Sequence, residues 1–188
     1  MPLFKKKTKK QSRSEQAERD ETVRSARAGD VFTISGLGLE YEDTYFLIEK
    51  KNRYEGAAAQ WHEILGVEGD RSIWVEWAGD AETITARPDE RPIGIAQAGI
   101  SERMLIEMDE EHSIDNTLEL GDDIYHYENS GEAFYFEEGR GEGQGFYLWE
   151  FSSQEAPKIL SVVKWEGAPF QVYVSEVLPL LSVSVYKR

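Results

Sequence analysis

Aromatic residues recur in this chain at a constant separation of 88 positions, and this spacing constrains the fold more than any other feature. Trp61 and Trp77 are followed at that separation by Trp149 and Trp165, so one shift pairs four of the five tryptophans. The same shift relates Phe46 to Phe134, Glu49 to Glu137, Val75 to Val163 and Gly79 to Gly167. A fixed period of this kind predicts that one supersecondary unit is built twice. We therefore interpret the paired tryptophans as core residues in two similar halves.

Short apolar runs separated by turn residues follow one another from Gly29 onward, which is typical of consecutive antiparallel strands. In the first half they predict strands at residues 31–35, 44–50, 60–67, 72–77 and 82–86. In the second half they predict strands at residues 123–128, 133–137, 145–151, 159–165 and 170–177, with a closing strand at 181–186. The prediction is an all-β fold of two tandem pseudo-repeats, each with about five antiparallel strands.

The folded domain is expected to span residues 29–188, with repeat one at residues 29–86, a connector at 87–120 and repeat two at 121–186. Each repeat alone is near the size at which a single core becomes marginal. We therefore expect the two repeats to share one core.

The connector is harder to interpret than the repeats. Pro88 and Pro92 indicate a loop. Residues 103–108 fit either a strand or a helical turn, because the run is too short for its periodicity to decide. Residues 109–112 are expected to form a solvated loop.

Charge is divided sharply along the chain. Residues 1–28 carry nine of the 21 Lys and Arg and four of the 36 Asp and Glu, a net charge of +5. Residues 29–188 carry the other twelve Lys and Arg and the other thirty-two Asp and Glu, which gives a net charge of −20. Because a domain this negative repels phosphate groups, the charge argues against nucleic acid as a partner.

A basic segment near the start of the chain is the clearest sequence signal for a partner. It consists of Leu3, Phe4, Lys5, Lys6, Lys7, Lys9 and Lys10. Near an anionic lipid surface each lysine contributes about 1 kcal/mol, and short apolar side chains enter the headgroup region. Residues 1–28 have no apolar stripe to dock, so we expect a disordered tail. The segment is read either as a peripheral anchor for an anionic membrane or as a solubilising terminus.

Composition narrows the chemistry and the compartment. The chain has no cysteine, which excludes disulfides and thiolate sites. No apolar run approaches the ~20 residues that span a bilayer, and the lysine-rich start lacks the apolar region of a signal peptide. We expect a cytoplasmic protein that can attach peripherally to the inner face of the membrane.

No motif indicates a catalytic centre, a cofactor or a metal site. His62, His112 and His126 lack a paired ligand spacing such as His-Glu-x-x-His. The glycine-rich residues 139–145 lack the Gly-Lys-[Ser/Thr] of a phosphate loop, and we expect a flexible hairpin loop there. The acidic residues 107–115 lack the alternation and the glycine of a calcium loop.

Trp74, Glu63 and Glu76 are the candidate residues for a ligand or partner surface. Trp74 has no tryptophan counterpart under the 88-position shift, and on a strand it points away from Ile73 and Trp77. Glu63 and Glu76 lie beside tryptophans, which can raise a carboxyl pKa by desolvation. Catalysis by paired carboxylates stays open, since among so many acids some pair will lie at a suitable separation.

Several short motifs resemble those of a known family. They are Gly29-Asp30, Gln60-Trp61-His62-Glu63, Ile73-Trp74-Val75-Glu76-Trp77, Gly121-Asp122 with Tyr125, and Ile159-Leu160-Ser161-Val162. Over about residues 29–186 the chain is similar to the bacterial domain of unknown function numbered four-one-seven-eight. The resemblance implies an all-β fold. It also implies association with membrane-stress proteins of the phage-shock-protein-A type and with aminopropyltransferase-like enzymes. It assigns no catalytic role to any residue of this chain.

Two functions are compatible with these observations. The first is a non-enzymatic interaction or accessory module that works with a protein partner in a bacterial membrane-stress system, with contact to an anionic membrane through the tail. The second is an acidic β-domain that binds a small cationic molecule such as a polyamine, or hydrolyses one. The acidic and aromatic content of residues 29–188 motivates this second function, because such side chains capture cations by ion pairs and cation–π contacts.

Deleting residues 1–12 is expected to abolish binding of the chain to anionic vesicles at low salt, because the deletion removes five clustered lysines with Leu3 and Phe4. Sedimentation with phosphatidylserine-containing liposomes measures the effect, and neutral liposomes serve as the control. If the deletion leaves sedimentation unchanged, the membrane interpretation is wrong.

Overall fold

Eleven strands and three short helical turns accompany one α-helix in the computed structural model, which describes residues 22–57 and 59–188. The strands of the first half are β1 (Val31–Ile34), β2 (Phe46–Gly56), β3 (Gln60–Glu68), β4 (Arg71–Ala78) and β5 (Thr83–Pro88). Those of the second half are β6 (Thr117–Leu120), β7 (Asp123–Phe136), β8 (Gln144–Ser153), β9 (Lys158–Trp165), β10 (Phe170–Pro179) and β11 (Val183–Tyr186). The helical elements are η1 (Val23–Ser25), α2 (Glu102–Glu111), η2 (Glu137–Gly139) and η3 (Leu180–Ser182).

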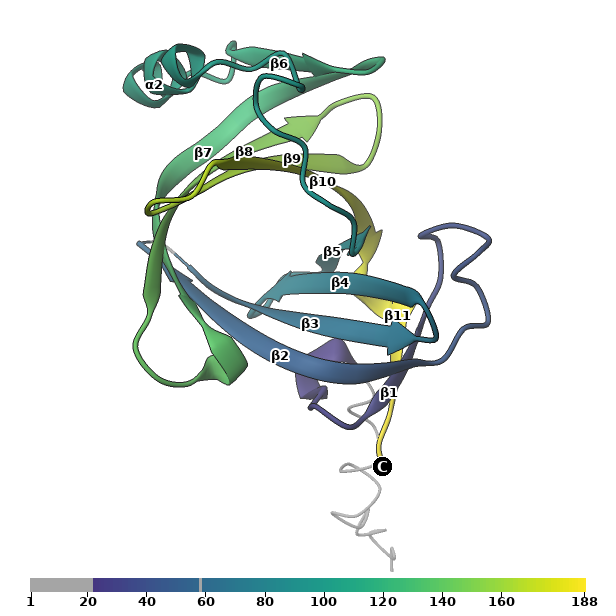
Figure 1. Cartoon of the computed structure of the whole chain (residues 1–188). Helices are drawn as coiled ribbons and strands as arrows, with labels where there is room; N and C mark the ends of the chain where they lie inside the picture. The colour runs from purple at the N-terminus through teal and green to yellow at the C-terminus, as the bar shows by residue number, and fades with distance from the viewer. Residues whose placement is uncertain (1–21, 58) are drawn as a thin grey trace, which may run out of the picture.

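All eleven strands belong to one antiparallel sheet that closes on itself. Its order is β11-β1-β2-β3-β4-β5-β10-β9-β8-β7-β6, and β2 pairs additionally with β7. The closed part is an eight-stranded barrel made of β2, β3, β4, β5, β10, β9, β8 and β7. Figure 1 shows β1, β11 and η1 on one side of this barrel, and α2 with β6 on the opposite side.

The sheet consists of two five-stranded meanders, β1–β5 and β6–β10, and of β11, which pairs with β1. Two short seams join them: residues 53–56 pair with 133–136, and residues 83–86 pair with 176–179. The predicted all-β fold with about five antiparallel strands in each half is confirmed.

The buried apolar residues form two clusters on the outside of the barrel wall. One lies between β2–β5 and the strands β1 and β11, and it includes Phe32, Ile64 and Val75. The other lies between β7–β10 and the cover formed by α2 and β6, and it includes Leu105 and Phe151. The expectation of one shared core is therefore wrong, because the barrel wall separates the two apolar clusters.

The tryptophans do not follow the repeat that their spacing predicts. Trp77 and Trp149 lie in the two outer clusters, with 3% and 7% of their surface exposed. Trp61 and Trp165, their partners in the two pairs, line cavities inside the barrel. Register disagrees as well, since Trp61 lies opposite Ala78 but Trp149 lies opposite Val162. In each predicted pair one ring belongs to an outer apolar cluster and the other does not, although Trp77 also borders the larger cavity of the barrel, so the residue-by-residue repeat is not supported.

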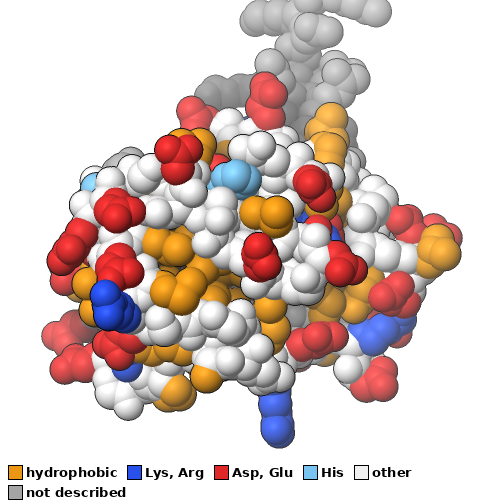
Figure 2. Space-filling view, turned by 90° about the horizontal axis from the view of Figure 1, so that it is seen from above, with side chains coloured by type: hydrophobic (Ala, Val, Ile, Leu, Met, Phe, Trp, Pro, Cys, Tyr) orange, Lys and Arg blue, Asp and Glu red, His pale blue; other side chains and the backbone are white. Residues whose placement is uncertain are grey.

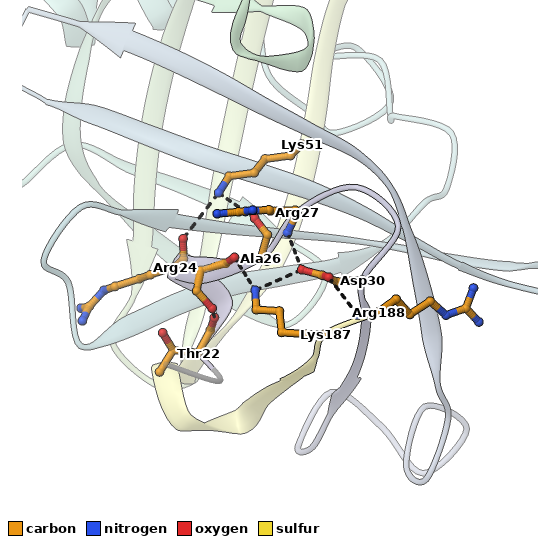
Figure 3. A network of polar contacts seen from close by, with 9 residues as sticks. Thr22, Arg24, Ala26, Arg27, Asp30, Lys51, Lys187 and Arg188 are labelled. Carbon is orange, nitrogen blue, oxygen red and sulfur yellow. Dashed lines mark hydrogen bonds and ion pairs between the residues drawn. The ribbon is translucent and has the colours of Figure 1, made fainter. Parts of the chain in front are cut away.

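The folded part begins before the predicted boundary at residue 29. Val23 and Ala26 are fully buried in the cluster under β1 and β11. Asp30, itself 6% exposed, accepts hydrogen bonds from Arg27 N at 3.0 Å and from Lys187 Nζ at 3.0 Å. Burial opposes ionisation of Asp30, but these bonds and one from Arg188 N lower its pKa below the usual value. Figure 3 shows how this network ties the segment before β1 to the segment after β11.

The connector contains a helix, which resolves the ambiguity left by its periodicity. The Ser101 side chain accepts a hydrogen bond from Met104 N at 3.3 Å and caps α2. Leu105 and Met108 share one face of the helix and are buried against the barrel. Residues 109–112 end this helix instead of forming the expected loop. Among the described residues no helix is long and apolar enough to cross a membrane.

Two strands of the second half differ from the prediction. β6 was not expected within the connector. Residues 123–128 and 133–137 were predicted as separate strands, but β7 is continuous from Asp123 to Phe136, with a bulge between Tyr127 and Asn129. Residues 129–132, between the two predicted runs, belong to the strand because they pair with residues 147–150 of β8.

Replacing Gly66 with alanine is expected to lower the free energy of unfolding by about 1–3 kcal/mol, the typical cost of overpacking. A Cβ at Gly66 would lie 2.4 Å from the Phe32 ring, which stacks on Phe46 in a fully buried site. Denaturant unfolding measures the loss. Gly79→Ala is the matched control, because a Cβ at Gly79 meets nothing within 4 Å. Equal stability of the two variants would contradict this account of the packing.

Candidate binding site inside the barrel

The inner face of the barrel wall carries polar and aromatic residues. Successive side chains of a strand point to opposite faces. On β4, Ile73, Val75 and Trp77 are buried in the outer cluster, and this leaves Trp74 and Glu76 on the inner face. The same alternation applies along the other strands of the barrel.

Two adjoining cavities occupy the barrel. The outer chamber has a volume of about 590 Å³ and the inner chamber about 100 Å³. Trp61, Glu76, Leu148 and Glu150 line both chambers, so the chambers meet at these side chains. The larger volume lies within the range of ligand pockets in proteins.

Three carboxylates line the inner chamber. Glu63 and Glu76 lie directly opposite each other on β3 and β4. Glu150 comes from β8, on the other meander. The closure of the barrel therefore brings carboxylates from both halves of the chain to one cavity.

Two of the carboxylates have an asparagine on the neighbouring strand as hydrogen-bond donor. Asn52 lies opposite Glu63 and donates from Nδ2 to Glu63 Oε1 at 2.9 Å. Asn129 lies opposite Glu150 and donates from Nδ2 to Glu150 Oε2 at 3.0 Å. Among the described residues no hydrogen-bond donor reaches the Glu76 carboxylate, which makes it the least satisfied of the three.

One cation balances these acids in part. The Arg87 guanidinium lies 4.4 Å from the centre of the Tyr173 ring and 5.8 Å from that of Trp74. Trp74 Nε1 in turn donates to Asp89 Oδ1 at 2.7 Å. Cation–π contacts with these two rings thus hold Arg87 near the carboxylates.

Burial keeps the three carboxyl groups from ionising at their usual pH. It raises the pKa of Glu63, although the Asn52 hydrogen bond and the charge of Arg87 oppose the rise. Burial and the negative charge of Glu63 raise the pKa of Glu76 to about 8. Burial also raises the pKa of Glu150 against the hydrogen bond from Asn129. Desolvation without full charge compensation is the common cause.

Aromatic rings complete the wall of the inner chamber. Tyr54 stacks on Trp61 with ring centres 5.1 Å apart and planes 3° apart. Phe146 packs on Trp165 with centres 4.6 Å apart. These faces are negatively polarised and attract cations.

The three candidate residues from the sequence lie on this inner face, on β3 and β4. Glu63 and Glu76 line the inner chamber, and Trp74 supports Arg87 beside it. The basic segment Leu3 to Lys10 lies outside the described residues. Sequence reasoning missed Glu150 and Arg87. Strand parity on β8 and β5 could have placed both on the inner face, but nothing local marks which face is inside.

The other sequence motifs do not join the site. His62 packs against Trp77 on the outside of the barrel, His112 ends α2 beside Tyr127, and His126 lies on β7. The glycine-rich loop joins β7 to β8 and begins with the turn η2. Within the described part of the chain, no three His, Asp or Glu side chains are arranged to hold a metal ion.

The outer surface is strongly acidic. Figure 2 shows the face that carries α2 and β6, with acidic side chains spread over it, few lysines and arginines, and hydrophobic side chains between them. Together with the net charge of −20 for residues 29–188, this surface creates a field that attracts cations to the molecule.

Comparison with known proteins identifies a family but no activity. A family model described as "Domain of unknown function (DUF4178)" matches residues 35–180. No curated protein matches the chain, and no solved structure does.

Glu76→Gln is expected to reduce the loss of stability of the protein as pH rises from about 5 to about 8. A carboxyl whose pKa is raised in the folded state binds more protons when folded than unfolded, so stability falls with pH between the unfolded value of 4.5 and the folded value of about 8. Glutamine stays neutral and removes that contribution. Melting temperatures across this pH range measure it, and we expect the variant to melt at least ~3 °C above the wild type at pH 8.

Glu166→Gln, a change at an exposed position, is the control and should follow the wild type. Parallel melting curves for the wild type and Glu76→Gln at every pH would show that Glu76 is not held neutral by burial.

Proposed function

Since the chain belongs to the DUF4178 family, whose description names no activity, we propose a function from the barrel interior alone: the protein binds a small organic cation there. The observation that carries the proposal is the set of three inward carboxylates facing one arginine in an aromatic-lined cavity. A polyamine or another amine has the required charge.

The charge balance of the interior supports a cationic ligand. When Glu63, Glu76 and Glu150 are all ionised, Arg87 is the only described cation that lines the inner chamber with them. Uncompensated buried charge is costly, so the carboxyl groups retain protons in the absence of a ligand. A bound ammonium would supply the missing positive charge and allow a carboxyl to release its proton.

The aromatic wall favours an organic cation. Ammonium groups gain about 0.5–2 kcal/mol over the face of a tryptophan or tyrosine. Trp61 and Trp165 both line the chamber that holds the carboxylates. An alkylammonium suits this chamber, because the carboxylates would bind its charged group and the ring faces would contact its adjacent methylene groups.

The interaction module in a membrane-stress system is a second proposal, and the charge division along the chain supports its membrane contact. Its membrane contact depends on residues 3–10, and the liposome experiment described above tests it. Ligand binding in the barrel and docking through the tail are compatible with each other.

Spermidine and n-butylamine are expected to raise the melting temperature of the protein at pH 8 more than magnesium chloride or sodium chloride of equal ionic strength. At a concentration of about 100 times Kd, a ligand stabilises the folded state by about 2.7 kcal/mol. Glu76→Gln should lose this response, and Glu166→Gln should retain it. Calorimetric titration in two buffers of different ionisation enthalpy should also give different heats, because binding releases a proton.

A response to magnesium equal to that of the amines would indicate charge screening instead of a site. An unchanged amine response in Glu76→Gln would exclude the barrel interior as the binding place.

A further inference from the structure

The two chambers of the barrel differ in chemistry, and the difference bears on the shape of the ligand. The inner chamber holds Glu63, Glu150 and Arg87 among aromatic rings. The outer chamber is about six times larger, and small residues such as Ala78 and Gly131 line it together with uncharged polar residues such as Thr83 and Ser130. The inner chamber therefore suits the charged group of a ligand, and the outer chamber suits its apolar part.

Within the inner chamber, most of the charge is already engaged. Glu63 accepts from Asn52, and Glu150 accepts from Asn129. Arg87 is seated over Tyr173 and attracts Glu63 and Glu76. Glu76 remains without a donor, and it lines both chambers. The place for one ammonium is therefore the junction of the two chambers.

The outer chamber offers little to a second ammonium. Gly56, Ala133 and Leu148 contribute no charge to its wall. Its additional acid, Glu132, is exposed, so water screens its attraction for a cation. The other polar residues of its wall, Thr83, Thr85, Asn129 and Ser130, carry no charge, so a second ammonium would form no ion pair with a buried carboxylate away from the junction.

Building on the proposed function, we propose that the barrel selects a monoamine with an apolar body over a polyamine. The ammonium lies between Glu76 and Glu150 where the chambers meet, and the apolar body lies in the outer chamber. The ligand class is a primary alkyl- or arylalkylamine.

The test is a calorimetric titration of the full chain at pH 8 with n-alkylamines from propylamine to octylamine, the α,ω-diamines of equal length and the corresponding alcohols. Burial of one methylene gains about 0.8 kcal/mol, so affinity should rise about fourfold for each carbon added to the monoamine. Each diamine should bind more weakly than the monoamine of the same length, and the alcohols should not bind.

A matched pair of variants locates the apolar body. A Cβ at Gly131 meets nothing within 4 Å, and Gly131 lines the outer chamber, so Gly131→Leu should fill part of that chamber without a backbone clash. It should weaken octylamine binding at least tenfold and leave propylamine binding unchanged. A Cβ at Gly79 also meets nothing within 4 Å, and Gly79 does not line the chamber, so Gly79→Leu should change neither.

The outcomes separate this inference from the proposed function. Diamines that bind as tightly as monoamines, affinity independent of chain length, or equal effects of the two glycine variants would overturn the monoamine inference while amine binding itself stands. Absence of binding by every amine would overturn both.

Discussion

Strand alternation is the constraint on which the rest of this structure depends. The barrel strands present their most apolar faces outward, and their inner faces carry polar and aromatic residues with a few aliphatic ones such as Leu148 and Val163. β1, β11 and η1 cover them on one side, and α2 with β6 covers them on the other. Since the hydrophobic stabilisation comes from these covers, the barrel interior does not have to serve as the core. An eight-stranded barrel is just wide enough to be filled by side chains or to hold one small ligand, and here a cavity remains.

Carboxylates inside such a barrel need partners that the fold itself must supply. Each meander provides one asparagine on the strand next to a glutamate, so Asn52 serves Glu63 and Asn129 serves Glu150. Asparagine fits this place because its amide donates a hydrogen bond without adding charge. Glu76 has no such donor, and its burial without one gives the interior its affinity for protons. The lack of a hydrogen-bond donor to Glu76 therefore characterises the site as much as the residues that line it.

Local pattern predicted the strands well and their relationship poorly. The period of two identified ten of the eleven strands at least in part, because alternation is a local property. The 88-position spacing misled because tryptophan serves two environments: Trp77 and Trp149 fill apolar clusters, whereas Trp61 and Trp165 line a cavity. A shift of one residue along a strand moves a side chain to the other face, so equal spacing does not establish equal surroundings.

The sequence by itself determined the all-β class, the acidic character of the folded part and the shared face of Trp74 and Glu76, since these follow from composition and strand parity. Only the tertiary structure decided that this face is the inside. That outcome depends on the pairing of β2 with β7, which closes the barrel and brings Glu150 to the chamber of Glu63 and Glu76. Tyr54 and Tyr135 are partners in that seam although they are distant in the chain. Pairing between distant segments depends on how whole sheets pack, so a local pattern of residues cannot predict it.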